Sequence, residues 1–254
     1  MSNKEKFLVD GVGTFEEYLK AINKDVEIDS MPGDVISQLI DHTQLKADSC
    51  RSQIEQLCEE AIRYSFKSVC VNPYWVPLAK DMLTGSYVKV CTVIGFPLGA
   101  TLCTAKAAET EQVIKAGATE VDMVLNVGAM KSRDYASVKK DVEKVVKAAQ
   151  GGALTKVILE TCLLSDEEIS AASVICAEAG ADYVKTSTGF STGGATPKAI
   201  SLMREAVGNE LGVKASGGVR SLEDLVNMVK AGATRIGASC GVDIMQGKES
   251  QGTY

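Results

Sequence analysis

The stretch AGATEVDMV, residues 116–124, sets the pattern of this chain because two near copies follow it. The copies are AGADYVKTS at 179–187 and AGATRIGAS at 231–239. Each follows a segment such as AKAAETEQVIKAGA, in which apolar residues recur at the three- and four-residue spacing of an amphipathic helix. The glycine is expected to end that helix, because a helix C-terminus often needs φ > 0. A short strand then follows, so the repeat predicts helices alternating with strands.

Other segments fit the same alternation of strand and helix. They lie at 39–43, 68–71, 89–94, 156–159 and 212–215. Together with the three copies they make eight short strands, each followed by a helical pattern. Alternating β and α units form parallel sheets, and eight units of this size suit a closed barrel. The sequence therefore predicts an α/β protein with a (β/α)₈ TIM barrel, and a doubly wound open sheet is the alternative.

The N-terminal part of the chain stands outside this alternation. TFEEYLKAI begins with Thr14, and Glu17 follows three residues later, which is the spacing of a capping box. We therefore expect an N-terminal helical extension over 1–34 and a barrel catalytic domain over 35–254. The extension is expected to cover part of the barrel or a subunit contact.

Composition excludes several classes of function. The 254 residues are 45% hydrophobic and 24% charged, as in an ordinary globular protein. The net charge of -6 argues against a general nucleic-acid binder. No apolar run approaches the roughly 20 residues of a membrane span, so no membrane partner is expected. The start, MSNKEKFLVDGVG, lacks the apolar core of a signal peptide, and this predicts a cytoplasmic protein.

The cysteines do not suggest a metal or a disulfide framework. None of the eight forms a C-x-x-C pair, and His42 is the single histidine of the chain. In a chain of this size, cysteines within apolar segments are expected to be buried free thiols. We expect neither a metal nor a cofactor.

Charged residues mark the predicted C-terminal ends of the strands, where barrel enzymes have their active sites. Five positions after the glycine, the three copies have Asp122, Lys185 and Gly237. Lys214, in GVKASGG, occupies the equivalent place on the seventh strand. Each residue alone is more often a solvated charge at a strand end. If these faces point inward, however, Asp122, Lys185 and Lys214 converge at the mouth of the barrel.

Two lysines in one barrel mouth suggest Schiff-base chemistry. A lysine attacks a carbonyl only when neutral, and its unperturbed pKa of about 10.4 keeps it protonated at neutral pH. A cationic neighbour and partial desolvation lower a lysine pKa toward the catalytic range. We therefore expect a lowered pKa for at least one of Lys185 and Lys214, with Asp122 moving protons beside them.

Glycine-rich loops after the last three strands predict a phosphate site. They are Gly189 with STGG at 191–194, SGG at 216–218 and GAS at 237–239. Barrel enzymes often bind phosphate with backbone N–H groups of these loops. None of them is the G-x-G-x-x-G that a nicotinamide dehydrogenase needs between its first strand and helix. The residues expected to contact substrate and phosphate are Thr186, Gly189, Gly217, Gly218, Gly237 and Ser239.

Six motifs together resemble the deoxyribose-phosphate aldolases, a family of class I aldolases with the (β/α)₈ fold. They are IDHTQLK (40–46), SVCVNPYWVPLAK (68–80), VIGFPLGA (93–100), EVDMVLNVGA (120–129), YVKTSTGF (183–190) and VKASGGVR (213–220). The resemblance covers about residues 36 to 254. It implies reversible, metal-independent cleavage of 2-deoxy-D-ribose 5-phosphate to D-glyceraldehyde 3-phosphate and acetaldehyde.

The resemblance also implies roles for single residues. Lys185 corresponds to the Schiff-base lysine, Lys214 to the second lysine, and Asp122 to the proton-relay aspartate. Some members carry a lysine where this chain has Phe190, which leaves phosphate binding to backbone amides with Arg220 as a helper. Some members end in a tyrosine that assists proton transfer, and this implies such a role for Tyr254. The other interpretation of this polar terminus is a disordered tail.

Two other functions remain open on the sequence. One is another Schiff-base or phosphate-binding barrel that acts on a different sugar phosphate. The other is a barrel that binds a sugar phosphate without catalysis. The expected partners are small molecules, the sugar phosphate and acetaldehyde, and a homo-oligomer such as a dimer is possible on this pattern.

Overall fold

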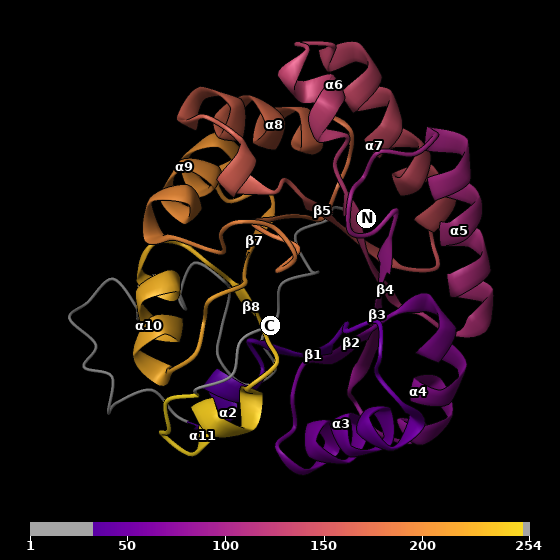
Figure 1. The fold of residues 1–254 in the computed structure, drawn as a ribbon, viewed down its shortest axis with the longest axis vertical. Coiled ribbons are helices and arrows are strands. Elements are labelled where there is room, and N and C mark those ends of the chain that lie inside the picture. Colours follow the sequence, from indigo (N-terminus) through magenta and orange to yellow (C-terminus); the bar gives the residue numbers. More distant parts are fainter. Residues whose placement is uncertain (1–32, 251–254) are drawn as a thin grey trace.

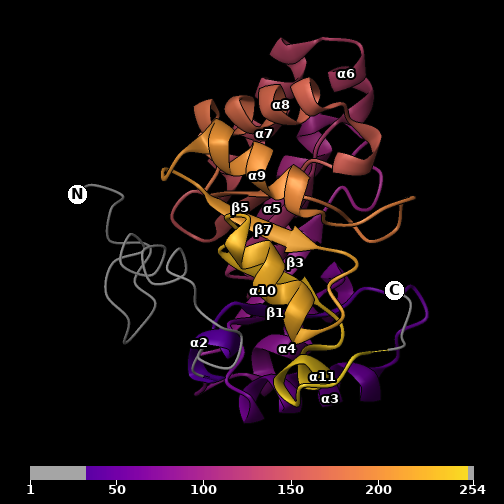
Figure 2. The ribbon, with the colours of Figure 1, turned by 90° about the vertical axis from the view of Figure 1, so that its left-hand side faces the viewer.

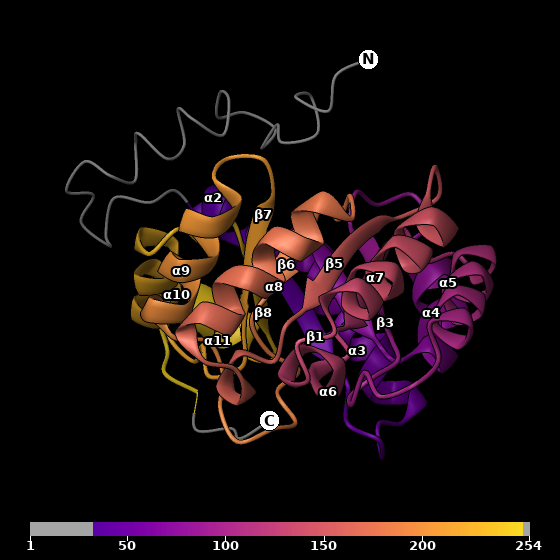
Figure 3. The same cartoon turned by 90° about the horizontal axis from the view of Figure 1, so that it is seen from above.

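A closed barrel of eight parallel strands forms the centre of the protein. The computed structural model describes residues 33–250. The strands pair in chain order from β1 to β8, and β8 pairs back with β1. Helices surround these strands on the outside (Figures 1 and 3). The predicted (β/α)₈ fold is therefore confirmed, and the open-sheet alternative is wrong.

The strands are β1 (Ile40–Gln44), β2 (Ser68–Val71), β3 (Lys89–Ile94), β4 (Glu120–Val124), β5 (Leu154–Ile158), β6 (Tyr183–Lys185), β7 (Gly212–Ser216) and β8 (Arg235–Ala238). The α-helices are α2 (Gly33–Ser37), α3 (Arg51–Arg63), α4 (Val76–Met82), α5 (Cys103–Ala116), α6 (Val127–Lys131), α7 (Tyr135–Ala149), α8 (Asp166–Glu178), α9 (Pro197–Val207), α10 (Leu222–Lys230) and α11 (Gly241–Met245). Short 3₁₀ turns, η3 (Pro73–Trp75) and η4 (Thr161–Leu163), follow β2 and β5. The expected helix near Thr14 and the expected role of Tyr254 lie outside the described residues.

The repeated glycine ends a helix, as the sequence predicts. Gly117 follows α5 with φ 116°, and its N–H bonds to carbonyls of the last helical turn. A Cβ built on Gly117 would lie 2.4 Å from the Lys80 side chain, so only glycine fits this turn. The turn returns the chain directly into β4.

Strand alternation separates the two faces of the barrel wall. On β4, Val121 and Met123 belong to the large apolar core between the strands and the helices. Glu120 and Asp122, which point the opposite way, are buried in ion pairs with residues of other strands. Helix α9 packs on β7, and α10 lies beside α9, so helices cover the outer side of β7 (Figure 2). The apolar shell thus closes a polar interior.

The lower part of this interior contains a buried arginine. Arg235 Nε lies 2.6 Å from Asp41 Oδ1, and Arg235 Nη2 lies 2.7 Å from Glu120 Oε2. The guanidinium also lies 5.9 Å from the centre of the Tyr183 ring. These contacts connect β8 with β1 and β4 across the barrel.

Removal of this guanidinium should destabilise the fold. Arg235→Met leaves two buried carboxylates short of a partner, and such losses typically cost about 3–5 kcal/mol in the free energy of unfolding. Urea denaturation at neutral pH measures this loss in the free energy of unfolding. The control is Arg51→Met, which removes an exposed pair with Glu55 and should cost about 1 kcal/mol or less. Equal losses in the two variants would contradict the structural role of Arg235.

Candidate active site

Asp122 brings two lysines together inside the barrel. Its Oδ2 atom lies 2.9 Å from Lys185 Nζ and 2.8 Å from Lys214 Nζ. Asp122 and Lys214 are fully buried, and Lys185 is 3% exposed. Lys185 ends β6, and Lys214 is its registered partner on β7. The structure therefore places the three residues expected at the barrel mouth in direct contact.

The other oxygen of Asp122 is also occupied. Asp122 Oδ1 lies 2.8 Å from Lys156 Nζ and accepts a hydrogen bond from the Cys91 thiol at 3.2 Å. Lys156, on β5, also lies 2.6 Å from Glu120 Oε2. One carboxylate therefore contacts three ammonium groups, and the inner layer of charges continues down to Glu120.

Asp41 supports Lys214 from the opposite side. Its Oδ2 atom lies 2.5 Å from Lys214 Nζ. Its Oδ1 atom contacts Arg235 Nε and accepts a hydrogen bond from Ser68 Oγ at 2.6 Å. Lys214 is thus held between two carboxylates.

These contacts fix the charges of the site. Burial alone would raise the pKa of Asp122, but the ammonium groups of Lys156, Lys185 and Lys214 hold it well below its usual range. Burial alone would lower the pKa of Lys214, but Asp122 and Asp41 raise it above its ordinary value. Asp122 is therefore a carboxylate and Lys214 an ammonium at neutral pH. The carboxylates outweigh the neighbouring cation at Lys214, so Lys214 is not a lysine whose pKa is lowered.

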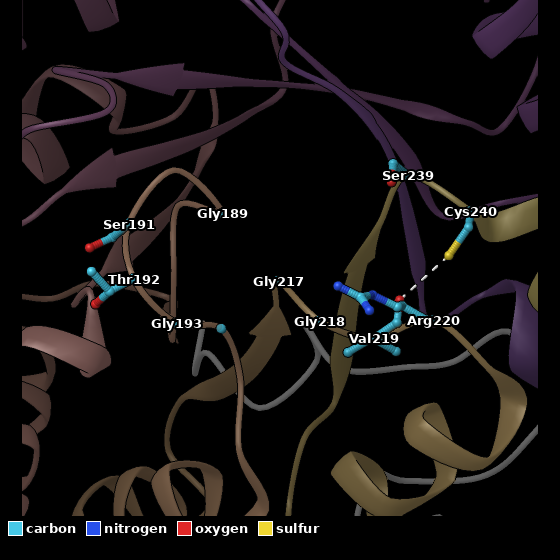
Figure 4. A pocket seen from close by; sticks show the side chains of 11 residues that line it. Gly189, Ser191, Thr192, Gly193, Gly217, Gly218, Val219, Arg220, Ser239 and Cys240 are labelled. Carbon is cyan, nitrogen blue, oxygen red and sulfur yellow. Dashed lines mark hydrogen bonds between the residues drawn. The ribbon is translucent and has the colours of Figure 1, made fainter. Parts of the chain in front are cut away.

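A pocket lies beside this cluster, at the loops that follow β6, β7 and β8. Its volume is about 200 Å³. Its lining residues are Gly189, Ser191, Thr192, Gly193, Gly194, Gly217, Gly218, Val219, Arg220, Ser239 and Cys240. Figure 4 shows Ser191 and Thr192 on one side of the hollow and Arg220 on the other. The pocket is polar and offers backbone N–H groups and one guanidinium.

Close backbone contacts build the wall of this pocket. A Cβ on Gly194 would lie 2.3 Å from the Gly217 carbonyl oxygen, which no side chain could tolerate. Next to it, Ala195 N–H bonds to the carbonyls of Ser216 and Gly217 at 3.1 and 2.9 Å. The loop after β6 therefore rests directly on the end of β7.

The expected binding residues divide into two groups. Gly189, Gly217, Gly218 and Ser239 line the pocket. Thr186 and Gly237 are not among its lining residues. The Thr186 hydroxyl bonds to the backbone of Ser216, and Gly237 lies under the Ser216 hydroxyl and Lys214.

Two buried hydroxyls, which were not among the residues expected to contact substrate, lie two residues after the two lysines. Ser187 follows Lys185 by two residues and Ser216 follows Lys214 by two. Neither hydroxyl oxygen has a hydrogen-bond partner among residues 33–250. Buried hydroxyls are normally paired, so these two are available to a bound molecule.

Lys156, Asp41, Glu120 and Arg235 were also not predicted as site residues. One signal for Arg235 existed in the repeat: it occupies the position that holds Glu120 and Tyr183 in the other copies. No such signal marked Lys156, whose partners lie on the neighbouring strand β4, or Asp41, whose partner Arg235 is 194 positions away along the chain.

His42 lies in IDHTQLK and Cys70 in SVCVNPYWVPLAK, two of the motifs that carry the family resemblance. His42 packs on Phe66 with ring centres 5.0 Å apart, and its Nε2 lies 2.7 Å from Glu60 Oε2 on α3. It therefore faces the outer helices. Cys70 lies within 4.8 Å of Cys91 Sγ and an Asp122 oxygen, the donor types of a metal site. Because Asp122 already contacts three ammonium groups, a dication there would meet strong repulsion.

Comparison with known proteins identifies the family. The family model described as DeoC/LacD family aldolase matches residues 35–247. The chain belongs to the DeoC/LacD aldolase family. The aldolase barrel is 61% identical over 220 residues to the deoxyribose-phosphate aldolase of Halalkalibacterium halodurans, with 86% of this chain and 98% of the relative covered.

Two further relatives of this aldolase agree. The deoxyribose-phosphate aldolase of Clostridium perfringens strain 13 is 59% identical over 219 residues, with 86% of this chain and 98% of the relative covered. A solved tetrameric deoxyribose phosphate aldolase from Aeropyrum pernix has a TM-score of 0.80 at 35% identity, covering 92% of this chain and 97% of that one. None of the helices within residues 33–250 has the length and apolar character needed to cross a membrane.

The charge network predicts how stability depends on pH. Nearby cations hold the pKa of Asp41 below its usual range against the effect of burial. Such a carboxyl adds stability above its unfolded pKa of about 3.9, and this stability is lost as the pH falls below that value. Asp41→Asn should therefore be less stable than the wild type at pH 7, with the difference narrowing below about pH 4.

Urea midpoints measured from neutral to acid pH test this expectation. The control is Asp48→Asn at an exposed position, which should differ little from the wild type at any pH. A constant difference between Asp41→Asn and the wild type across this range would contradict the assigned charge of Asp41.

Proposed function

We propose that this aldolase reversibly cleaves 2-deoxy-D-ribose 5-phosphate to D-glyceraldehyde 3-phosphate and acetaldehyde through a Schiff base on Lys185. One observation carries the proposal: Asp122 Oδ2 contacts both Lys185 and Lys214 beside a polar pocket formed by the loops that follow their strands. Relatives about 60% identical that bear the name deoxyribose-phosphate aldolase support the substrate.

The contacts and the exposure of Lys185 support it as the nucleophile. Within the buried ion-pair network Lys185 contacts one carboxylate, whereas Lys156 and Lys214 each contact two. Lys185 is also 3% exposed, whereas Lys156 and Lys214 are fully buried. Lys185 is therefore the amine of this cluster that an aldehyde reaches most readily, and an amine attacks a carbonyl through its lone pair.

The reaction then proceeds in balanced steps. The Lys185 amine attacks C1 of the open-chain sugar, and loss of water gives an iminium. The C3 hydroxyl passes its proton to a water molecule held by Asp122 and Lys214, the C2–C3 bond breaks, and its electrons flow into the iminium to leave an enamine and glyceraldehyde 3-phosphate; the same relay supplies the proton for the next step. Protonation of the enamine carbon and hydrolysis release acetaldehyde and regenerate the amine.

Asp122 and Lys214 handle the protons in this scheme. The pKa of Asp122 lies well below its usual range, so Asp122 is a weak base and a strong partner for cations. Its main effect is to hold Lys214 and the iminium of Lys185 in one arrangement. Lys214, whose pKa is raised, is the proton donor of the pair, and a water molecule connects it with the reacting carbon.

The pocket binds the phosphate and thereby positions the sugar. Gly189, Gly217, Gly218 and Arg220 line this pocket, and their backbone N–H groups and the guanidinium are the proposed donors to the phosphate. Binding energy from this remote group holds C1 near Lys185. The buried hydroxyls of Ser187 and Ser216 contact sugar hydroxyls between the two ends. A dimer and a cytoplasmic location remain predictions, and the relative from Aeropyrum pernix is described as a tetramer.

Chemical trapping tests the proposed nucleophile. Treatment with acetaldehyde and borohydride should reduce the imine to N-ethyl-lysine on the peptide that contains Lys185, with parallel loss of cleavage activity. Lys185→Met should abolish the adduct, whereas Lys139→Met, at an exposed ion pair on α7, should leave it unchanged. Peptide mass spectrometry locates the adduct. An adduct on Lys214, or none in the wild type, would refute the assignment.

A further inference from the structure

The chain makes an irregular step where β5 ends beside the Lys185 strand. Leu159 N–H bonds to the Lys185 carbonyl and Thr161 N–H bonds to the next carbonyl, that of Thr186, both at 2.9 Å. Two residues on one side therefore correspond to one on the other, which is the pattern of a β-bulge. Glu160 is the extra residue, and its backbone is left-handed with φ 57° and ψ 60°. Glutamate rarely adopts this conformation, and such strain concentrates at functional sites.

The bulge directs a buried carboxylate at the loop after β6. Glu160 is 4% exposed and Thr188 is 3% exposed. Glu160 Oε2 accepts a hydrogen bond from the Thr188 hydroxyl, and Oε1 accepts one from the Thr188 N–H at 3.3 Å. The Thr188 hydroxyl in turn accepts a hydrogen bond from the Phe190 N–H at 3.0 Å. This chain of bonds fixes the backbone on both sides of Gly189.

Gly189 begins the wall of the polar pocket, three residues after Thr186 (Figure 4). The far end of the same loop is fixed by Ala195 N–H on the carbonyls of Ser216 and Gly217. In its middle, a Cβ on Gly193 would lie 3.0 Å from Cys162 Cβ in η4, so the loop also rests on the segment after Glu160. The Glu160–Thr188 contact is therefore the anchor of the loop on the Lys185 side.

We propose that Glu160 is a positioning residue that holds the pocket loop at the distance from Lys185 that a phosphorylated sugar requires. The inference rests on the proposed function and deepens it. Glu160 acts through Thr188 and Gly189 and does not touch the reacting atoms. Without Glu160, the bound phosphate therefore positions the sugar less well relative to Lys185, whereas imine formation at Lys185 is intact.

Two substrates separate this role from a merely structural one. Glu160→Gly removes the carboxylate and suits the left-handed backbone, and Thr188→Val removes the hydroxyl without changing the bulge. Each should lower kcat/KM for 2-deoxyribose 5-phosphate about 10- to 100-fold, the range expected for hydrogen bonds to a buried charge. The kcat/KM for unphosphorylated 2-deoxyribose should fall less than about threefold. The rate of borohydride trapping with acetaldehyde should stay at the wild-type value.

Control variants complete the design. Glu178→Gln, at an exposed carboxylate on α8, should match the wild type with both substrates. Thr188→Ser keeps the hydroxyl and should regain most of the discrimination that Thr188→Val loses. If Glu160→Gly does not fold, the comparison of Thr188→Val with Thr188→Ser on the two substrates provides the same test.

Four results are decisive. Equal losses with both substrates, or no loss with the phosphorylated one, would overturn the positioning role of Glu160. Selective loss with the phosphorylated substrate alone supports it. A wild-type enzyme that cleaves neither substrate would refute the proposed function itself, and this failure appears before any variant is compared.

Discussion

The ionised carboxylate of Asp122 is the contact on which the site depends. It lies within 2.9 Å of three buried ammonium groups that come from β5, β6 and β7. Isolated buried charges are strongly disfavoured, so these lysines require ionised partners. Asp122 serves all three, while Glu120 also pairs with Lys156 and Asp41 with Lys214. The same contacts hold the pKa of Asp122 well below its usual range. The structural role of Asp122 and its proposed catalytic role therefore depend on the same contacts.

The barrel makes this concentration of charge possible. Apolar residues of each strand face the helices, and the alternate residues point to the axis, where they find partners across the barrel. Asp41 and Arg235 connect the first and the last strand, and Arg235 reaches Glu120 on the fourth. The ion pairs of Arg235 with Asp41 and Glu120 thereby fix the strands that position Asp122 and Lys214. The closed barrel and the candidate site therefore share the same contacts.

The two parts of the site, the lysine cluster and the loop pocket, differ in their surroundings. The lysines are buried inside the barrel, each in contact with the Asp122 carboxylate. The pocket beside them is built from loops in which glycines let the backbone approach closely, as at Gly194 and Gly217. Such loops supply donors to an anion without adding bulk. The Glu160 bulge joins the two parts, because it lies between the Lys185 strand and the pocket loop.

The sequence predicted local features well. The three glycine repeats gave the strand order, and the spacing after each glycine placed Asp122 and Lys185 on inward faces. Predicted strand ends differ by one or two residues from β1 and β5, because a short strand ends where its hydrogen bonds end, not where its apolar residues end. The catalytic roles of Lys185, Lys214 and Asp122 remain predictions, although the structure brings the three together.

Contacts between residues that are far apart along the sequence could not be predicted. Asp41 and Arg235 are 194 positions apart, and their pairing depends on the closure and register of the barrel. The raised pKa of Lys214 likewise depends on Asp41, which no local pattern marked. Glu160 was missed because a bulge changes the direction of a side chain that regular alternation would place elsewhere.

The charge of Asp122 is the central claim, and carbon NMR measures it directly. The protein is prepared with aspartate labelled with ¹³C at Cγ, and the Asp122 signal is assigned by its loss in Asp122→Asn. We predict the shift of an ionised carboxylate that does not change from about pH 8 down to about pH 4, where an ordinary aspartate is already close to half protonated. A signal that has moved about halfway to the shift of the protonated acid by about pH 4 would show that the lysines do not hold Asp122 ionised, and would contradict the account.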